Sequence, residues 1–267
     1  AGTFNATNVS GVTLYDISYI YDPLSLTNLG SNETVQINTD VDAGIESVAS
    51  YGDLTFTAKA ASGANVLNLN FVDEDTTNAL DIAGENFAAG GDQILIQSYG
   101  AINMALGNHA TGNDVYVFDL NLLDSTGKED TSANYNAAMV TARTLTVTGG
   151  GDLGAKGSVG GVDTASFTGL TNVLSTIDFS HFTGQVTANV DLWNDSVFVP
   201  ANPGDPTTLD RNVNILLNGY GADLTENDLV ATDTTIVNYK FTTDVVANTE
   251  VVKITGFDAF NTAGNDL

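Results

Sequence analysis

The sequence predicts an all-β protein in which short strands stack in parallel into a β-solenoid or β-roll. Two observations lead to this fold class. Apolar and polar residues alternate over short runs, and clusters of Gly, Asn, Asp and Thr separate one run from the next. The runs begin roughly every 8 to 14 residues, a spacing that a pair of β-sandwich domains would also give. Sandwich domains therefore remain the alternative to the solenoid.

The alternation is clearest in two stretches, residues 51–106 and 143–193. A weaker run near the N-terminus predicts a strand through Leu14 and Ile17. Because side chains along a strand point alternately to its two faces, we expect the apolar member of each run to face the core. The predicted core positions are Leu54/Phe56/Ala58, Leu67/Leu69/Phe71, Leu80/Ile82, Ile94/Ile96, Ile102/Met104/Leu106, Leu145/Val147, Ile177/Phe179 and Val186/Ala188/Val190.

Proline placement suggests how the chain is divided. Three of the four prolines lie within residues 200–206, which we interpret as a loop or linker. We expect residues 1–199 to form the β-rich solenoid-like body and residues 207–267 a second β-rich segment. The sequence stops at Leu267 where another strand would begin, so we interpret this last segment as truncated.

The charge balance excludes several classes of partner. The chain has 33 Asp and Glu against 7 Lys and Arg, a net charge of −26. Too few cations are present to neutralise phosphates, so we expect no nucleic-acid partner. No apolar run approaches the ~18 residues that a membrane-spanning helix needs, so we expect no membrane insertion.

The acidic residues instead predict calcium binding. The chain has no cysteine, which excludes disulfides and thiolate metal sites. Most of the acids are aspartates, and many lie among the Gly, Asn and Thr of the turns. Short carboxylates in turns suit the all-oxygen coordination of Ca²⁺, and the bound ion would offset the self-repulsion of the chain. The competing interpretation is a solvated acidic surface.

The candidate Ca²⁺ ligands fall into five groups along the chain. In the first group, Asn38, Asp40 and Asp42 alternate along the chain and would project to one side of an extended segment. The segment is not an EF-hand loop, because Ala43 stands where that loop needs glycine. The candidates are Asp40 and Asp42; Asp73, Asp75 and Asn78; Gly112, Asp114 and Asp119, with Asn121 and Asp124 as additional ligands; Asp191 and Asp195; and Asn218, Gly221 and Asp223. The aspartates interpreted as turn residues of the central stretch, Asp152, Asp163 and Asp178, rank behind Asp114 and Asp223.

Two segments, together with the closing GND that contains Asp266, resemble a known calcium-binding repeat. The segments GNHATGNDVYVFD, around Asp114, and NGYGAD, ending at Asp223, resemble the nonapeptide G-G-x-G-x-D-x-U-x of the repeats-in-toxin (RTX) calcium β-roll. Both are partial matches, since Ala110 and Thr111 replace the leading glycines of the first and Thr225 takes the apolar position of the second.

The central segment, which contains LTVTGGGDL and GLTNVLSTIDFSHFTG, is similar to the solenoid regions of calcium-dependent surface-layer (S-layer) proteins of Gram-negative bacteria. That resemblance implies secretion by the type I route, an extracellular location at the cell surface and self-assembly into a two-dimensional lattice. It also implies contact with cell-surface polysaccharide. The start AGTFNATN has no basic and apolar leader pattern, which fits another export signal or an excised fragment.

Catalytic motifs are missing from the sequence. It contains no G-x-S-x-G, no P-loop and no H-E-x-x-H, and neither His109 nor His181 lies in a metal-ligand pattern. We therefore predict that the protein is not an enzyme. Two alternatives remain: a calcium-dependent adhesin module, and a polysaccharide lyase or epimerase built on a β-helix. The lyase would need one of the seven basic residues beside a pair of acids.

Overall fold

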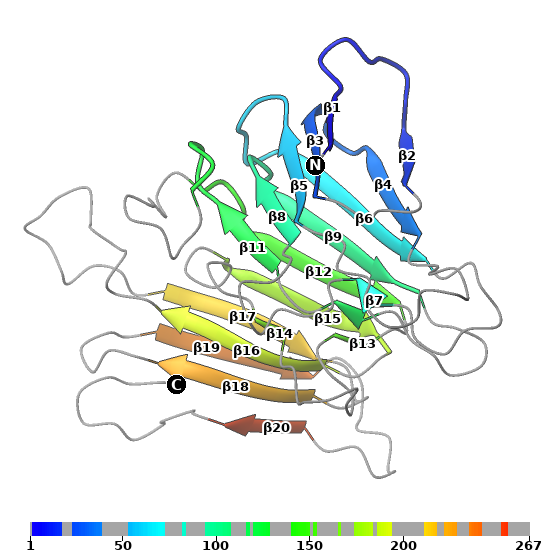
Figure 1. Ribbon diagram of the computed structural model, residues 1–267. Helices are drawn as coiled ribbons and strands as arrows, with labels where there is room; N and C mark the ends of the chain where they lie inside the picture. Colours follow the sequence, from blue (N-terminus) through cyan, green and yellow to red (C-terminus); the bar gives the residue numbers. More distant parts are fainter. Residues whose placement is uncertain are drawn as a thin grey trace, which may run out of the picture.

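The computed structural model shows an all-β chain whose strands stack in parallel, as the sequence predicts (Figure 1). It describes residues 2–17, 23–38, 53–72, 82–83, 94–107, 116–117, 120–128, 140–149, 152–153, 165–166, 174–183, 186–193, 211–217, 222–228, 235–241 and 252–255. Within these residues every strand pairing is parallel, which is the solenoid arrangement and not that of an antiparallel sandwich.

The strands form three sheets, which we name A, B and C. Sheet A consists of β1 (Gly2–Asn5), β3 (Leu24–Leu29), β5 (Leu54–Ala58), β8 (Ile94–Gln97) and β11 (Leu120–Leu123). Sheet B runs through β2 (Leu14–Ile17), β4 (Thr34–Asn38), β6 (Val66–Val72), β9 (Ala101–Leu106), β12 (Thr144–Gly149), β15 (Thr176–Phe182), β17 (Arg211–Leu217) and β19 (Thr235–Phe241). Sheet C consists of β7 (Ile82–Ala83), β10 (Tyr116–Val117), β13 (Asp152–Leu153), β16 (Val186–Trp193), β18 (Ala222–Asp228) and β20 (Val252–Thr255), with β14 (Ala165–Ser166) beside β16.

The make-up of a coil changes along the solenoid. Each coil contributes one strand to sheet B. In the first coils a strand of sheet A precedes it, and in the middle coils a two-residue strand of sheet C also follows it. From β15 onward the described strands alternate between sheets B and C alone. Sheet B is thus the wall shared by all coils, while the sheet that accompanies it changes from A to C.

The core is built from rows of apolar side chains that stack from coil to coil. On sheet B one such row links neighbouring strands residue to residue. None of its members is more than 1% exposed: Leu67, Ile102, Leu145, Ile177 and Ile215. The alternation seen in the sequence is what produces this row, because every second residue of each strand faces inward.

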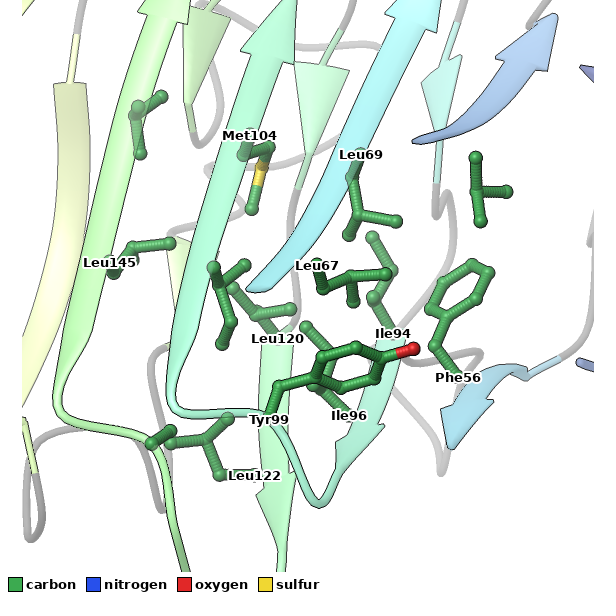
Figure 2. Close-up of a cluster of buried hydrophobic side chains, with 14 of the residues drawn as sticks. Phe56, Leu67, Leu69, Ile94, Ile96, Tyr99, Met104, Leu120, Leu122 and Leu145 are labelled. Atoms are coloured by element: carbon green, nitrogen blue, oxygen red, sulfur yellow. The ribbon is translucent and has the colours of Figure 1, made fainter. Parts of the chain in front are cut away.

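Sheet A supplies a second row. Phe56 pairs with Leu26 on one side and Ile96 on the other, and Ile96 pairs with Leu122. All four side chains are buried. Figure 2 shows the Tyr99 ring lying beside Ile96 and below Leu67, with its hydroxyl directed toward Phe56. Tyr99 therefore fills the corner between the two rows.

The sheets continue on both sides of the predicted proline-rich loop. β15 pairs with β17, and β16 pairs with β18. Residues 200–206 themselves lie outside the described residues. Strands on either side of them therefore belong to the same two sheets.

Candidate functional site

Most of the predicted Ca²⁺ ligands cannot be placed. The structure describes neither their backbone nor their side chains, so their assignment stays a prediction. They are Asp40, Asp42, Asp73, Asp75, Asn78, Gly112, Asp114, Asp119, Asp195, Asn218 and Gly221.

Two predicted ligands have a described backbone, in neighbouring strands of sheet C. Asp191 lies in β16 and Asp223 in β18, where Asp223 pairs with Thr187. Asp191 lies four residues along the strand from Thr187, so at roughly 3.3 Å per residue the two aspartates are about 13 Å apart along the strands. On its other side Asp223 pairs with Lys253 of β20. The backbone register therefore places these two predicted ligands at different levels of sheet C, with Lys253 as the strand partner of Asp223.

Asp178 was expected in a turn, and that expectation is wrong. It lies inside β15, where its Oδ1 accepts a hydrogen bond from the Ser180 backbone N–H at 2.8 Å. The register between β12 and β15 shifts just there, so the carboxylate supports a β-bulge. Asp152 likewise lies in a strand, β13.

Asp124 has a structural role of the same kind. Its side chain is only 1% exposed, and Oδ1 accepts hydrogen bonds from the backbone N–H of Thr126 and Lys128 and from the Thr126 hydroxyl. These contacts hold the loop after β11 closed. In the described part of the chain no group of three or more acids and histidines is placed to hold a metal ion.

The structure instead reveals a polar cluster that the sequence analysis missed, inside the first coils. Glu33 lies two residues before the buried Val35 and thus on the inward side, at the start of the row that continues through Leu67. One carboxylate oxygen accepts a hydrogen bond from the Gly30 N–H at 2.7 Å. A Cβ on Gly30 would come within 2.7 Å of the other oxygen, so a larger residue at that position would displace the Glu33 carboxylate.

Two tyrosines complete this cluster, which we call the Glu33 cluster: Tyr15, Glu33 and Tyr99. The hydroxyl oxygens of both tyrosines are buried, and the Tyr99 hydroxyl has no hydrogen-bond partner. Burial, followed by the charge of Glu33, raises the pKa of both Tyr15 and Tyr99. The cluster therefore holds two protonated phenols beside one carboxylate. With a single acid it lacks the ligands for Ca²⁺.

The outer face of sheet B carries ladders of polar side chains. The Asn103 Nδ2 donates to Asn68 Oδ1 at 2.9 Å, and the Asn70 Nδ2 donates to Gln36 Oε1 at 3.2 Å. The Gln36 amide in turn reaches Asp16 Oδ1 at 3.5 Å. Such ladders present hydrogen-bonding groups at the strand spacing of about 4.8 Å.

Arg143, one of the basic residues that a lyase or epimerase could use, has a structural contact in this fold. The Arg143 guanidinium donates to the backbone carbonyls of Val140 and Ala142, at 2.9 and 2.5 Å, at a corner of the solenoid. Its role there is to hold the chain entering β12.

Comparisons with protein-family models, curated proteins and solved structures returned no match. Among the described residues, no helix is long and apolar enough to cross a membrane.

Proposed function

We propose that this chain is a structural subunit of a secreted, calcium-dependent bacterial surface layer. The observation that carries the proposal is the parallel stacking of sheet B from β2 to β19, with an apolar row that runs from Leu67 to Ile215. A body in which every coil packs on its neighbours resists bending and presents long, regular faces, as a lattice-forming subunit requires.

Calcium has a defined physical task in this proposal. A net charge of −26 opposes both the compact state and the approach of a second copy. Ca²⁺ held by Asp and Asn side chains and turn carbonyls would cancel part of that charge and bridge coils or copies. The partners are then other copies of the chain, together with polysaccharide at the cell surface.

The test is the stability of the folded chain with and without calcium. We expect Ca²⁺ to raise the unfolding free energy by about 2.7 kcal/mol at a hundred times its dissociation constant, and Mg²⁺ to do much less. Thermal and urea unfolding after chelation, and again after adding back each ion, measure this difference. A melting curve that chelator leaves unchanged would contradict the proposal.

A pair of matched variants tests which aspartates are responsible for the Ca²⁺-dependent stability. Asp114→Asn should reduce the Ca²⁺-dependent gain in stability, whereas Asp178→Asn should leave that gain intact. The reason is that the Asp178 carboxylate already serves the β15 bulge. Electron microscopy of the Ca²⁺-loaded protein should then show ordered two-dimensional arrays.

One observation favours an adhesin module as the second candidate. The amide ladders outside sheet B, such as Asn68 with Asn103, offer repeated donors and acceptors for the hydroxyl groups of a glycan. Isolated particles in the microscope, together with glycan binding, would favour the adhesin over the surface layer.

A further inference from the structure

The outer face of sheet B carries no charged side chain over four consecutive strands, β4, β6, β9 and β12, which lie side by side in Figure 1. The described side chains that alternate with the buried ones there, from Thr34 on β4 to Thr148 on β12, are threonine, asparagine, glutamine, alanine and valine. Asp16 on β2 and Asp178 on β15 are the first acids on either side. We call the outer surface of these four strands the neutral face.

The neutral face is regular and its side chains are already restricted. Its rows cross from strand to strand in register, since Asn68 pairs with Asn103 and Asn103 pairs with Thr146. The Asn103 Nδ2 donates to Asn68 Oδ1, and the Asn70 Nδ2 donates to Gln36 Oε1. The threonines and valines are β-branched and have few rotamers. Little side-chain entropy therefore remains to be lost when a partner binds.

The neutral face is more open than the corresponding face of sheet A. The described side chains on the outer face of sheet A are also uncharged. That face is closed over β8 and β11, however, where Leu95, Asn121 and Leu123 are at most 7% exposed. On the neutral face the outward side chains are half-buried, and Asn103 is exposed. The neutral face is thus the broader uncharged surface that another molecule can reach.

Charge and periodicity indicate which partner fits this surface. A strongly charged partner would find no opposite charge on it. A second copy of the chain carries the same rows at the same strand spacing of about 4.8 Å, so the donors and acceptors of two neutral faces match along the stack. Asparagine and glutamine ladders stabilise interfaces between paired sheets. The net charge of −26 opposes the approach of two copies, and a contact through the neutral face keeps acids out of its centre.

We propose that two copies of this chain pack face to face through the neutral face of sheet B. The contact is isologous, so it closes as a dimer about a two-fold axis that lies between the two faces. The inference rests on the proposed function, because it names one surface through which the surface-layer subunit contacts another copy.

The size of the neutral face predicts a weak contact. Four strands about 4.8 Å apart and about 20 Å long cover roughly 400 Å². A stable complex buries about 800 Å² on each partner. We therefore expect a dimer that forms at high protein concentration and dissociates on dilution, which suits a contact that an assembly repeats many times.

Cysteine cross-linking traps such a weak contact. Asn103 is exposed and lies on β9, an inner strand of the neutral face, so it is close to a two-fold axis through the middle of that face. The chain has no cysteine, so Asn103→Cys introduces a single thiol. Under mild oxidation we expect this variant to form a disulfide-linked dimer much faster than Ser125→Cys. Ser125 is the matched control, because it is also exposed but lies in the loop after β11. Equal rates from the two variants, or no dimer from the first, would overturn the proposal.

A charge placed on the neutral face tests the contact without a covalent bond. Asn103→Asp brings two like charges together in the dimer and should weaken self-association on the order of tenfold or more in sedimentation equilibrium. Ser125→Asp adds the same charge away from the face and should change self-association little. Circular dichroism checks that both variants are folded. Equal weakening by both variants would mean that net charge governs association, and a wild-type chain that stays monomeric at high concentration would also contradict the contact.

The two proposals can fail separately. Calcium-dependent stability in a chain that stays monomeric removes the face-to-face contact and leaves the calcium-dependent subunit. Dimerisation that Asn103→Asp weakens, with a melting curve that chelator leaves unchanged, does the reverse.

Discussion

The N-terminal and C-terminal parts of the solenoid share sheet B but differ in the second sheet that accompanies it. Through β11, a strand of sheet A comes before each strand of sheet B in the chain; from β15 onward a strand of sheet C comes after it. The apolar row on sheet B does not change across this exchange, since Leu67 and Ile215 belong to the same row and are equally buried. The inward face of sheet B is therefore the constant element of the described fold.

Cavity-forming substitutions in the two parts should produce the largest effects. Phe56→Ala in sheet A should lower the unfolding free energy by about 3 to 5 kcal/mol, and Ile215→Ala in sheet B by about 2 to 5 kcal/mol. Both side chains are fully buried. Because coils interact mainly with their neighbours, Phe56→Ala should speed amide hydrogen exchange in β3–β8, and Ile215→Ala in β15–β19. Equal loss of protection in both parts would mean that the solenoid opens as one unit.

Substitution of Gly149, at the end of β12 where sheet A gives way to sheet C, should have the next largest effect on stability. Gly149 has a φ of +99°, and a Cβ there would lie 2.0 Å from the Leu106 carbonyl oxygen. Gly149→Ala should therefore cost about 2 to 3 kcal/mol through backbone strain and displacement of β9. Urea unfolding measures the loss. Gly63→Ala is the control, because nothing lies within 4 Å of a Cβ at that position.

The Glu33 cluster makes the N-terminal part sensitive to alkaline pH. Burial and Glu33 raise the pKa of Tyr99 above its ordinary value of 10.0. Above roughly pH 10 the unfolded chain therefore releases this proton while the folded chain keeps it, so stability falls as pH rises. Tyr99→Phe should reduce that fall.

At neutral pH the same variant should be neutral, or about 1 kcal/mol more stable, because it removes a buried hydroxyl without a partner. Urea unfolding at neutral and alkaline pH compares the two proteins. A loss of stability at neutral pH would show that the Tyr99 hydroxyl contributes a favourable contact.

The polar ladders on the outer face of sheet B should contribute least to the free energy of unfolding. Asn103→Ala removes an exposed side-chain hydrogen bond to Asn68 and should cost about 0.5 kcal/mol. The comparison with Ile102→Ala, one residue away on the inner face, is the direct test. We expect the inner substitution to cost several times more, and similar losses would contradict the assignment of the two faces.

The sequence was sufficient to locate strands β5, β6, β8, β9, β12 and β15 and the side chains on them that face the core. Residues such as Leu67 and Ile102 alternate with polar neighbours, and period-2 alternation has one physical explanation. It could not show that Ile102 pairs with both Leu67 and Leu145, or that sheet A gives way to sheet C, because pairing depends on residues far apart in the chain.

Functional residues were harder to predict. The inward position of Glu33 could have been read from its spacing to Val35 and Ile37, but its neighbours Tyr15 and Tyr99 come from separate coils. Asp178 was placed in a turn because Asp is common there, and the bulge that it supports depends on the register with β12. The calcium ligands remain predictions, since the side chains proposed for them lie outside the described part of the chain.

The side-chain rows that run from coil to coil have a consequence for how such a chain can change in length. Side chains that touch across neighbouring coils are 20 residues apart at Asp16 and Gln36, and 35 apart at Asn68 and Asn103. The rows nevertheless stay aligned. The number of residues between strands of neighbouring coils can therefore vary without changing how those strands pair. Longer connections cost little additional loop-closure entropy. Such a scaffold can acquire or lose surface segments one coil at a time, which makes its connections suitable places to graft foreign peptides.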